Sequence, residues 1–150
     1  MSDRIQFHRI GPENAALLAA ADAFDQPVDP VQLAAFVADP GHEMIVATEG
    51  AKVVGMASGT VVLHPDQKPA FFVNEVGVEE AVRSRGIGTA LVERLLDTAR
   101  ARGCASIWLA TEATNRAARA LYRKLGARET EGVVVYDWGV DMGDGGANAT

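Results

Sequence analysis

The sequence predicts a single α/β (α+β) domain built around one mixed sheet. Its 150 residues suit one domain, and its 48% hydrophobic and 23% charged residues are ordinary for a globular protein. Strand-like and helix-like segments alternate through the second half of the chain, after a hairpin-like pair of strands. That order is typical of a mixed sheet covered by helices.

The N-terminal part predicts one strand and two helices. Residues 5–10 alternate apolar and polar side chains, as a half-buried strand does. Gly11-Pro12 breaks the pattern and is expected to open a helix over 12–24. Asp29 is placed to cap a second, short helix that begins with Pro30.

Two strands are expected next, over 43–48 and 52–63, joined by a tight turn at 49–51. The second strand contains Gly55 and Gly59, which indicates a bulge or a close approach of another backbone. The rest of the chain predicts, in order, a buried strand over 71–78, a helix that follows Gly88 and runs to about 102, a strand over 105–110, a helix over 116–125 and a last strand over 133–140. The apolar stripe expected on the first of these helices consists of Ile87, Leu91, Leu95 and Ala99.

We expect one domain over residues 1–141, followed by a Gly-rich, frayed tail over 142–150. Cys104 is the single cysteine, which excludes an internal disulfide and favours a reducing compartment. No apolar run approaches the length of a membrane span, and the first ten residues lack a signal-peptide core. The expectation is a cytoplasmic protein that does not associate with membranes.

Charge is distributed unevenly along the chain. Residues 83–128 have a net charge of +7, whereas the remainder has −13, within a total of −6. A basic segment suits a polyphosphate ligand, and an acidic remainder suits a cationic one, although such charges also solvate ordinary helix faces. Nucleic acid is excluded as a partner because the chain is acidic overall and lacks a basic stripe with interleaved aromatic residues.

The segment 83–89, RSRGIGT, predicts an anion site. Gly86 and Gly88 remove side chains where the backbone turns into a helix, so successive N–H groups can face a diphosphate. The helix N-terminus and two arginines add positive charge. A P-loop is excluded because no Lys follows the glycines, and a dinucleotide fingerprint because its third glycine is replaced by Leu91.

Two segments together resemble the GNAT superfamily of N-acetyltransferases. VGVEEAVRSRGIGTALVERLL is similar to its R-x-x-G-x-G/A acetyl-CoA segment, and WLATEATNRAARALYRKLGARE to its later strand, Asn-led helix and tyrosine. The resemblance covers residues 71–129. It implies a GNAT fold, with a mixed, splayed sheet of six or seven strands flanked by four helices, and transfer of an acetyl group from acetyl-CoA to an amine.

The same resemblance implies a set of residues that bind acetyl-CoA. Backbone groups of one strand end would hold the pantetheine arm, the glycine loop would hold the pyrophosphate, and the later helix would complete the site. These residues are, respectively, Val76, Gly77 and Val78; Arg83, Ser84, Arg85, Gly86, Ile87, Gly88 and Thr89; and Asn115, Ala118 and Tyr122.

The resemblance also implies catalytic roles. Tyr122 would protonate the leaving thiolate, and Glu75 or Glu112, directly or through water, would accept the proton of the substrate amine. The backbone N–H of Val78 could stabilise the oxyanion. Alternatives stay open: Tyr122 as a core residue, Glu75 as a member of an ion pair, and Glu112 as a residue that only precedes a helix cap. No metal site is expected, because His8, His42 and His64 lack the spacing of metal ligands.

For the acceptor, FFVNEVGVEEAVRSRGIGTALVERLL and ALYRKLGARE are similar to aminoglycoside 3-N-acetyltransferases. A cationic small-molecule amine also suits the acidic side chains expected around the cleft, which are Asp22, Asp25, Asp29, Asp39, Glu43, Glu75 and Glu112. The open alternatives are another amine (polyamine, amino acid or protein N-terminus) and an acetyl-CoA-binding module without catalysis. Whether the chain forms a homodimer is also left open.

Overall fold

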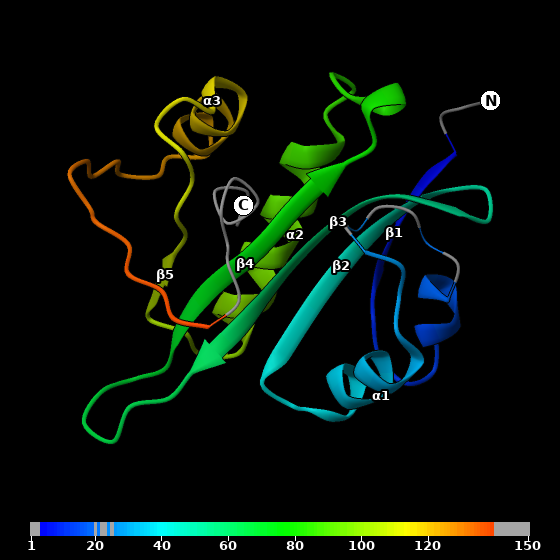
Figure 1. The fold of residues 1–150 in the computed structure, drawn as a ribbon, viewed down its shortest axis with the longest axis horizontal. Coiled ribbons are helices and arrows are strands. Elements are labelled where there is room, and N and C mark those ends of the chain that lie inside the picture. Colours follow the sequence, from blue (N-terminus) through cyan, green and yellow to red (C-terminus); the bar gives the residue numbers. More distant parts are fainter. Residues whose placement is uncertain (1–3, 20, 22–23, 25, 140–150) are drawn as a thin grey trace.

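The computed structural model describes residues 4–19, 21, 24 and 26–139, which form one five-stranded mixed sheet in the order β1-β2-β3-β4-β5 (Figure 1). The strands are β1 (Ile5–Arg9), β2 (His42–Glu49), β3 (Lys52–Val62), β4 (Ala70–Val78) and β5 (Ser106–Trp108). Neighbouring strands from β1 to β4 are antiparallel, and β5 is parallel to β4. The helices are η1 (Ala15–Leu18), α1 (Pro30–Ala38), η2 (Glu80–Val82), α2 (Ile87–Ala101) and α3 (Arg116–Lys124), of which η1 and η2 are 3-10 turns.

Helices cover the two faces of the sheet unequally. We call the face toward the viewer in Figure 1 the front face and the opposite one the back face. On the back face, α2 packs against a large apolar core that includes Phe71, Leu91 and Leu95. On the front face, η1 and α1 pack over the side of β1–β3, against Met44, Val46 and Met56. No described helix covers the front of β4 and β5 (Figure 1).

Local sequence accounts for both long helices. The Asp29 carboxylate accepts hydrogen bonds from the N–H groups of Val31 and Gln32, and Pro30 occupies the first helical position, which confirms the predicted start of α1. In α2 the residues spaced three and four apart are buried, namely Ile87, Leu91, Val92, Leu95 and Ala99, which confirms the apolar stripe.

The irregularity expected in β3 is a bulge that pairs with β4. The register shifts between Ser58 and Gly59, so that Ser58 faces Glu75 while Gly59 faces Val73. A Cβ atom on Gly59 would lie 2.2 Å from the Phe71 ring, so only glycine fits there. The bulge leaves both Asn74 and Glu75 between Val73 and Val76, whose side chains pack on the back face.

Two predicted elements, the helix over 12–24 and the strand over 133–140, are wrong. The described sheet has five strands rather than six or seven, and the described residues form three α-helices rather than four. The helix expected over 12–24 is only the turn η1 in its described part. The Asn14 side chain accepts from the N–H of Gly11 and donates to the carbonyl of Arg9, which favours a local turn over a helix.

The strand expected over 133–140 is also absent as far as Gly139, where the described part of the chain ends. Its large apolar side chains are exposed, and a strand gains stability only from a neighbour that it pairs with. Strand β5 is shorter than the 105–110 predicted. The tail predicted over 142–150 lies outside the described residues. Within the described ranges, no helix has the length and apolar character that crossing a membrane requires.

Candidate active site

The central feature of the site is the place where β4 and β5 diverge. The two strands pair only through Ala70, Phe71 and Phe72 of β4, which face Ser106, Ile107 and Trp108 of β5. The rest of β4, up to Val78, pairs with β3 on its other side. Among the described residues, no strand pairs with the other backbone edge of Val76, Gly77 and Val78. A strand-like ligand can therefore form hydrogen bonds along this open edge.

The loop after β4 has the backbone of an anion site. Gly86 is the N-cap of α2 with φ of 79°, and Ser84 has φ of 68°, so two left-handed residues alternate before the helix. A Cβ atom on Gly86 would meet nothing within 4 Å, which shows that the loop faces open space. The first N–H groups of α2 have no acceptor within the helix and point toward that space.

The two loop arginines, which both precede the glycines, each make a contact within the chain. The Nε atom of Arg83 donates to the carbonyl of Val78 at 3.1 Å, which ties the loop to the end of β4. Arg85 pairs with Glu49 of β2 at 3.4 Å, an exposed contact that is readily exchanged for another anion. Ser84 lies between them and is exposed, like both arginines.

Helix α3 brings the second predicted segment to the first turn of α2. A Cβ atom on Gly88 would lie 3.3 Å from the Leu121 side chain and 3.6 Å from that of Val78. Asn115 caps α3 by accepting from the N–H of Ala118 at 3.1 Å, which confirms its structural role. The open edge of β4, the glycine loop and α3 thus surround one region.

Tyr122 occupies the inner side of α3 and is half-buried. Burial raises the pKa of its phenol above the ordinary value, so the hydroxyl keeps its proton at neutral pH. Its hydroxyl forms no hydrogen bond with another residue of the described ranges, so the satisfied core tyrosine of the alternative interpretation is not observed. A protonated phenol is able to donate to a leaving group.

Glu112 lies away from the strand that carries Glu75. It is exposed on the turn after β5, where its carbonyl accepts from the N–H of Asn115 at 2.9 Å. Together with Tyr122 it lines a cavity of about 730 Å³ between β5, α2, α3 and residues 125–133. This cavity shares only Tyr122 with the predicted acetyl-CoA residues, so it is distinct from the open edge of β4.

Glu75 lies on the front face of β4. Val73, Val76 and Val78 pack into the back-face core, and the bulge places Asn74 and Glu75 on the other side. The Asn74 amide donates to the hydroxyl of Thr60 at 2.8 Å, which shows its front-face position directly. Glu75 is partly buried and lies beside the open edge of β4, where a substrate amine on the front face would meet it.

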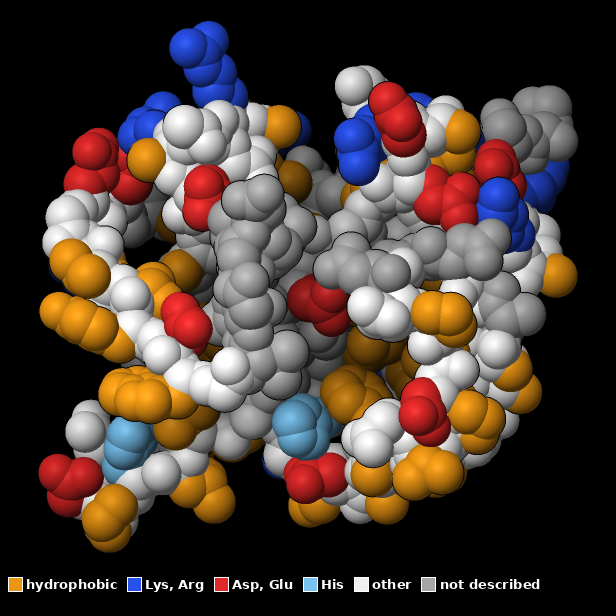
Figure 2. Space-filling model, viewed as in Figure 1, with side chains coloured by type: hydrophobic (Ala, Val, Ile, Leu, Met, Phe, Trp, Pro, Cys, Tyr) orange, Lys and Arg blue, Asp and Glu red, His pale blue; other side chains and the backbone are white. Residues whose placement is uncertain are grey.

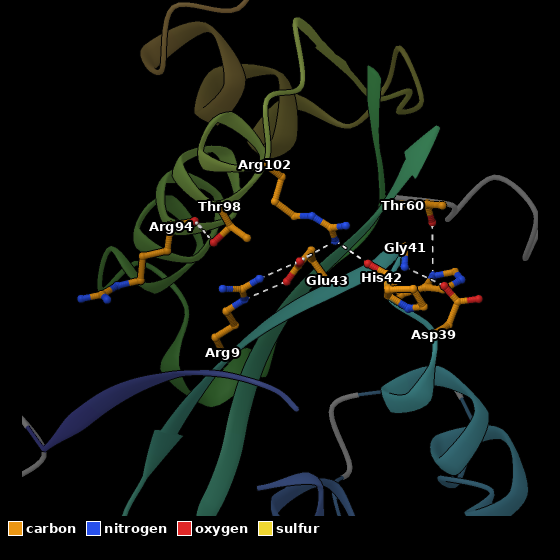
Figure 3. A network of polar contacts seen from close by, with 10 residues as sticks. Arg9, Asp39, Gly41, His42, Glu43, Thr60, Arg94, Thr98 and Arg102 are labelled. Carbon is orange, nitrogen blue, oxygen red and sulfur yellow. Dashed lines mark hydrogen bonds and ion pairs between the residues drawn. The ribbon is translucent and has the colours of Figure 1, made fainter. Parts of the chain in front are cut away.

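Of the acidic side chains predicted to surround the acceptor, Glu43 lies on the opposite face of the sheet from Glu75, so that part of the prediction is wrong. Glu43 is 4% exposed on the back face, where Arg9 binds it in a bidentate pair at 2.9 and 2.8 Å and Arg102 adds a contact at 2.8 Å (Figure 3). Asp39 accepts from the N–H of Gly41, and Asp29 caps α1. Asp22 and Asp25 lie outside the described residues.

Several basic side chains of the segment 83–128 are likewise paired within the chain. Arg102 is held by Glu43, and Arg119 and Arg123 both contact Glu129 of the segment after α3. Hydrogen bonds from Arg119 and then Arg123 lower the pKa of Glu129 to about 2. Part of the positive charge of the segment 83–128 is therefore neutralised within the chain.

Sequence reasoning missed a polar chain on the front face. The Thr60 hydroxyl lies 3.4 Å from Nδ1 of His42 and accepts from Asn74. The sequence signal was weak: Thr60 lies between Gly59 and Val61, but His42 is followed by Glu43 and Asn74 by Glu75. Among the described residues, no cluster of His, Cys, Asp and Glu side chains could hold a metal ion.

Comparison with known proteins identifies the family. Residues 13–127 match the model of the Acetyltransferase (GNAT) family, which is more than half of the chain. The chain belongs to the GNAT family of acetyltransferases. Enzymes of this family use acetyl-CoA, and the open edge of β4, the glycine loop and the N-terminus of α2 fit its pantetheine arm and pyrophosphate.

The relatives differ in the amine that they acetylate. The [ribosomal protein bS18]-alanine N-acetyltransferase of Escherichia coli is 38% identical over 82 residues, which are 55% of this chain and 52% of that protein. The chain thus spans about half the length of the curated relatives it matches. An aminoglycoside acetyltransferase from an uncultured soil metagenomic sample is 25% identical, with a TM-score of 0.75 over 91% of this chain and 99% of that one.

A third similarity concerns the fold alone. The aminoglycoside N-acetyltransferase AAC(6')-Iy, solved in complex with CoA, is 17% identical with a TM-score of 0.73, over 90% of this chain and 95% of that one. Its CoA complex agrees with the use of acetyl-CoA by the GNAT family.

Proposed function

We propose that this chain transfers the acetyl group of acetyl-CoA to an amine of a polycationic small molecule, with aminoglycosides as the substrate class. The observation that carries the proposal is the position of Glu75. It is the carboxylate that lies on the front face of β4 beside the open backbone edge. A carboxylate there attracts a cationic amine and can take its proton.

The proposed reaction uses one group on each side of the gap between β4 and β5. Acetyl-CoA supplies an acetyl thioester along the open edge of β4. Glu75 accepts a proton from the substrate ammonium, so that the neutral nitrogen forms the new C–N bond while the C–S bond breaks. Tyr122 donates its proton to the departing sulfur, and its raised pKa keeps that proton available at neutral pH. The second proton, released by the nitrogen as the neutral amide forms, returns through water to the Tyr122 phenolate. In this proposal the N–H of Val78, at the same edge, binds the negative oxygen.

Support for the aminoglycoside class comes from two sides. The sequence resembles aminoglycoside 3-N-acetyltransferases, and a soil metagenomic aminoglycoside acetyltransferase has the same fold at 25% identity. A 6'-class enzyme also shares the fold. The solved aminoglycoside acetyltransferases with this fold are of the 6' class or of unstated position, so they do not favour the 3-amino group. Fragment masses of the product would identify the nitrogen that is acetylated.

A protein N-terminus is the second candidate, because the bS18-alanine N-acetyltransferase is 38% identical over the matched residues. Because Arg9 and Arg102 bind Glu43 on the back face, charge alone separates the two candidates less than the sequence predicted.

The test is a thiol-release assay with acetyl-CoA and four acceptors: gentamicin, spermidine, an alanine-initiated peptide and free alanine. We expect turnover with gentamicin, and a loss of roughly 10²–10⁴-fold in kcat for Glu75→Gln. Glu112→Gln is the matched control and should change kcat less. Turnover of the peptide alone would replace the aminoglycoside with the protein N-terminus, and acetyl-CoA binding without any turnover would indicate a binding module.

A further inference from the structure

A row of four side chains crosses the front face of the sheet from β2 to β5. His42 faces Thr60, Thr60 faces Phe72, and Phe72 faces Trp108 in the strand registers. The His42 ring lies within 3.4 Å of the Thr60 hydroxyl, and the rings of Phe72 and Trp108 lie 4.3 Å apart with a tilt of 45°. Because direct neighbours on adjacent strands share a face, the row is continuous.

Alternation along the strands confirms the face. Phe71 and Val73 are buried in the back-face core, so Phe72 between them projects forward. Ile107 and Leu109 also pack on that core, so Trp108 projects forward as well. Trp108 is 56% exposed on β5, the outermost strand of the described sheet, so a large apolar surface is open to a ligand there.

The aromatic pair and Glu75 belong to one surface. Phe72 and Glu75 are three residues apart on β4, which separates them by about 10 Å along the strand. Asn74 and Thr60 form the polar floor between them, joined by a 2.8 Å hydrogen bond. Figure 2 shows this face, where hydrophobic side chains gather over β5 and the segment that follows α3.

We propose that Phe72 and Trp108 form a second anchor for the acceptor, which holds a cationic ring of a multi-ring amine while another of its amines reacts beside Glu75. This inference rests on the proposed function and narrows its substrate class. Aromatic faces attract cations and pack against the flat faces of rings, and a nearby carboxylate raises the local concentration of cations. An acceptor with two cationic rings about 10 Å across can reach both points, whereas a single-ring amine cannot.

The kinetic test compares neamine, which has two rings, with 2-deoxystreptamine, which has one. For Trp108→Ala we expect KM for neamine to rise roughly 5–30-fold, with little change in KM for 2-deoxystreptamine or acetyl-CoA. Trp108→Phe should restore part of the affinity, and Trp138→Ala, which changes an 88% exposed tryptophan, is the matched control. An equal rise for both amines, or no rise, would overturn the proposal.

A binding test separates this inference from the proposed function. In Trp138→Phe, Trp108 is the single tryptophan, so its fluorescence reports contact with neamine directly. A saturable change without acetylation would support the anchor and refute the catalytic proposal. Acetylation without a change would do the reverse. A Trp108→Ala variant that changes the oligomeric state in gel filtration, but not KM, would show that the aromatic pair is an interface between copies and overturn the inference.

Discussion

Two regions of the molecule are packed very differently. The first is the sheet formed by β1–β4 together with α2, and the second is the part of the chain after α2. The first region is covered by α2 on its back face and by η1 and α1 on much of its front. In the second region, α3 contains no buried residue, and large apolar side chains after it are exposed, namely Val133, Val134, Val135, Tyr136 and Trp138. The glycine loop belongs to the well-packed region and Tyr122 to the other. The proposed cofactor loop and the proposed proton donor therefore lie in regions of unequal packing, for which we expect unequal stability.

Two carboxylates show the same contrast at the level of single groups. Glu43 and Glu129 each contact two arginines. Burial alone would raise the pKa of Glu43, but hydrogen bonds from Arg9 and Arg102 outweigh it and hold the pKa below its ordinary value. Glu129 lies at the surface, where hydrogen bonds from Arg119 and Arg123 lower its pKa against a smaller opposing effect of desolvation. The same arrangement of one carboxylate and two arginines therefore stabilises the fold at Glu43, whereas at Glu129 it only connects two surface segments.

The largest effect is expected from Gly86→Asp in the well-packed region. The substitution places a negative carboxylate in the open space before α2, where we propose that the pyrophosphate binds. We expect affinity for acetyl-CoA, measured by calorimetry, to fall on the order of 100-fold or more.

Two controls isolate the charge. Gly86→Asn has the same shape without the charge and tolerates the left-handed φ of 79°, so it should retain more affinity. Gly50→Asp repeats the strain at another left-handed glycine, in the β2–β3 turn, where an added Cβ also meets nothing. Wild-type binding by a folded Gly86→Asp variant would remove the pyrophosphate site from this loop.

The next effect is expected from Tyr122→Phe in the loosely packed region. The change removes only the hydroxyl, so kcat should fall roughly 10²–10⁴-fold while acetyl-CoA affinity and the melting temperature stay near wild type. Tyr136→Phe alters the other tyrosine, which is 78% exposed, and serves as the control. Unchanged turnover would assign Tyr122 to packing alone.

A stability effect is expected from Glu43→Gln, since the neutral amide cannot satisfy both arginines. Loss of charge-assisted hydrogen bonds on a buried group should lower the free energy of unfolding by roughly 2–3 kcal/mol, measured by urea denaturation. The difference from wild type should depend on pH. Because the folded pKa of Glu43 lies below its unfolded value of about 4.5, its contribution is complete above that pH and is lost as pH falls further. A difference that grows on acidification would contradict this assignment.

The smallest effect is expected from Glu129→Gln. Although its pKa is about 2, the carboxylate is a surface group, and solvent screens its pairs with Arg119 and Arg123. The midpoint of urea unfolding should stay within error of wild type at pH 7. A loss as large as that of Glu43→Gln would show that the second region is packed as firmly as the first.

Prediction from sequence succeeded where local signals agree with packing. The cap of α1, the stripe of α2 and the bulge at Gly59 follow from residues whose roles are local or periodic. It failed where a long-range partner decides. The acidic side chain of Glu43 was expected to contact the substrate, but it is buried and paired with Arg9 and Arg102, which are distant in sequence. The apolar run after α3 has strand propensity but pairs with no described strand.

The candidate site divides in the same way. The glycine loop could be predicted from its sequence because backbone conformation at Gly86 is a local property. The front-face position of Glu75 depends on the bulge in its register with Ser58, and the row from His42 to Trp108 depends on three strand pairings. These alignments arise only when the sheet assembles. The sequence shows which residues of a strand share a face, but not which residues of the neighbouring strand lie opposite them.

The divergence of β4 and β5 also has a consequence for handling the free protein. The edge of β4 from Val73 to Val78 is a row of backbone donors and acceptors without a neighbouring strand among the described residues. Such an edge is a template on which another extended chain can add and start aggregation. A pantetheine arm lying along it would act as a removable cap. In addition to its proposed role as the acetyl donor, we therefore expect acetyl-CoA to slow aggregation in concentrated samples of the protein.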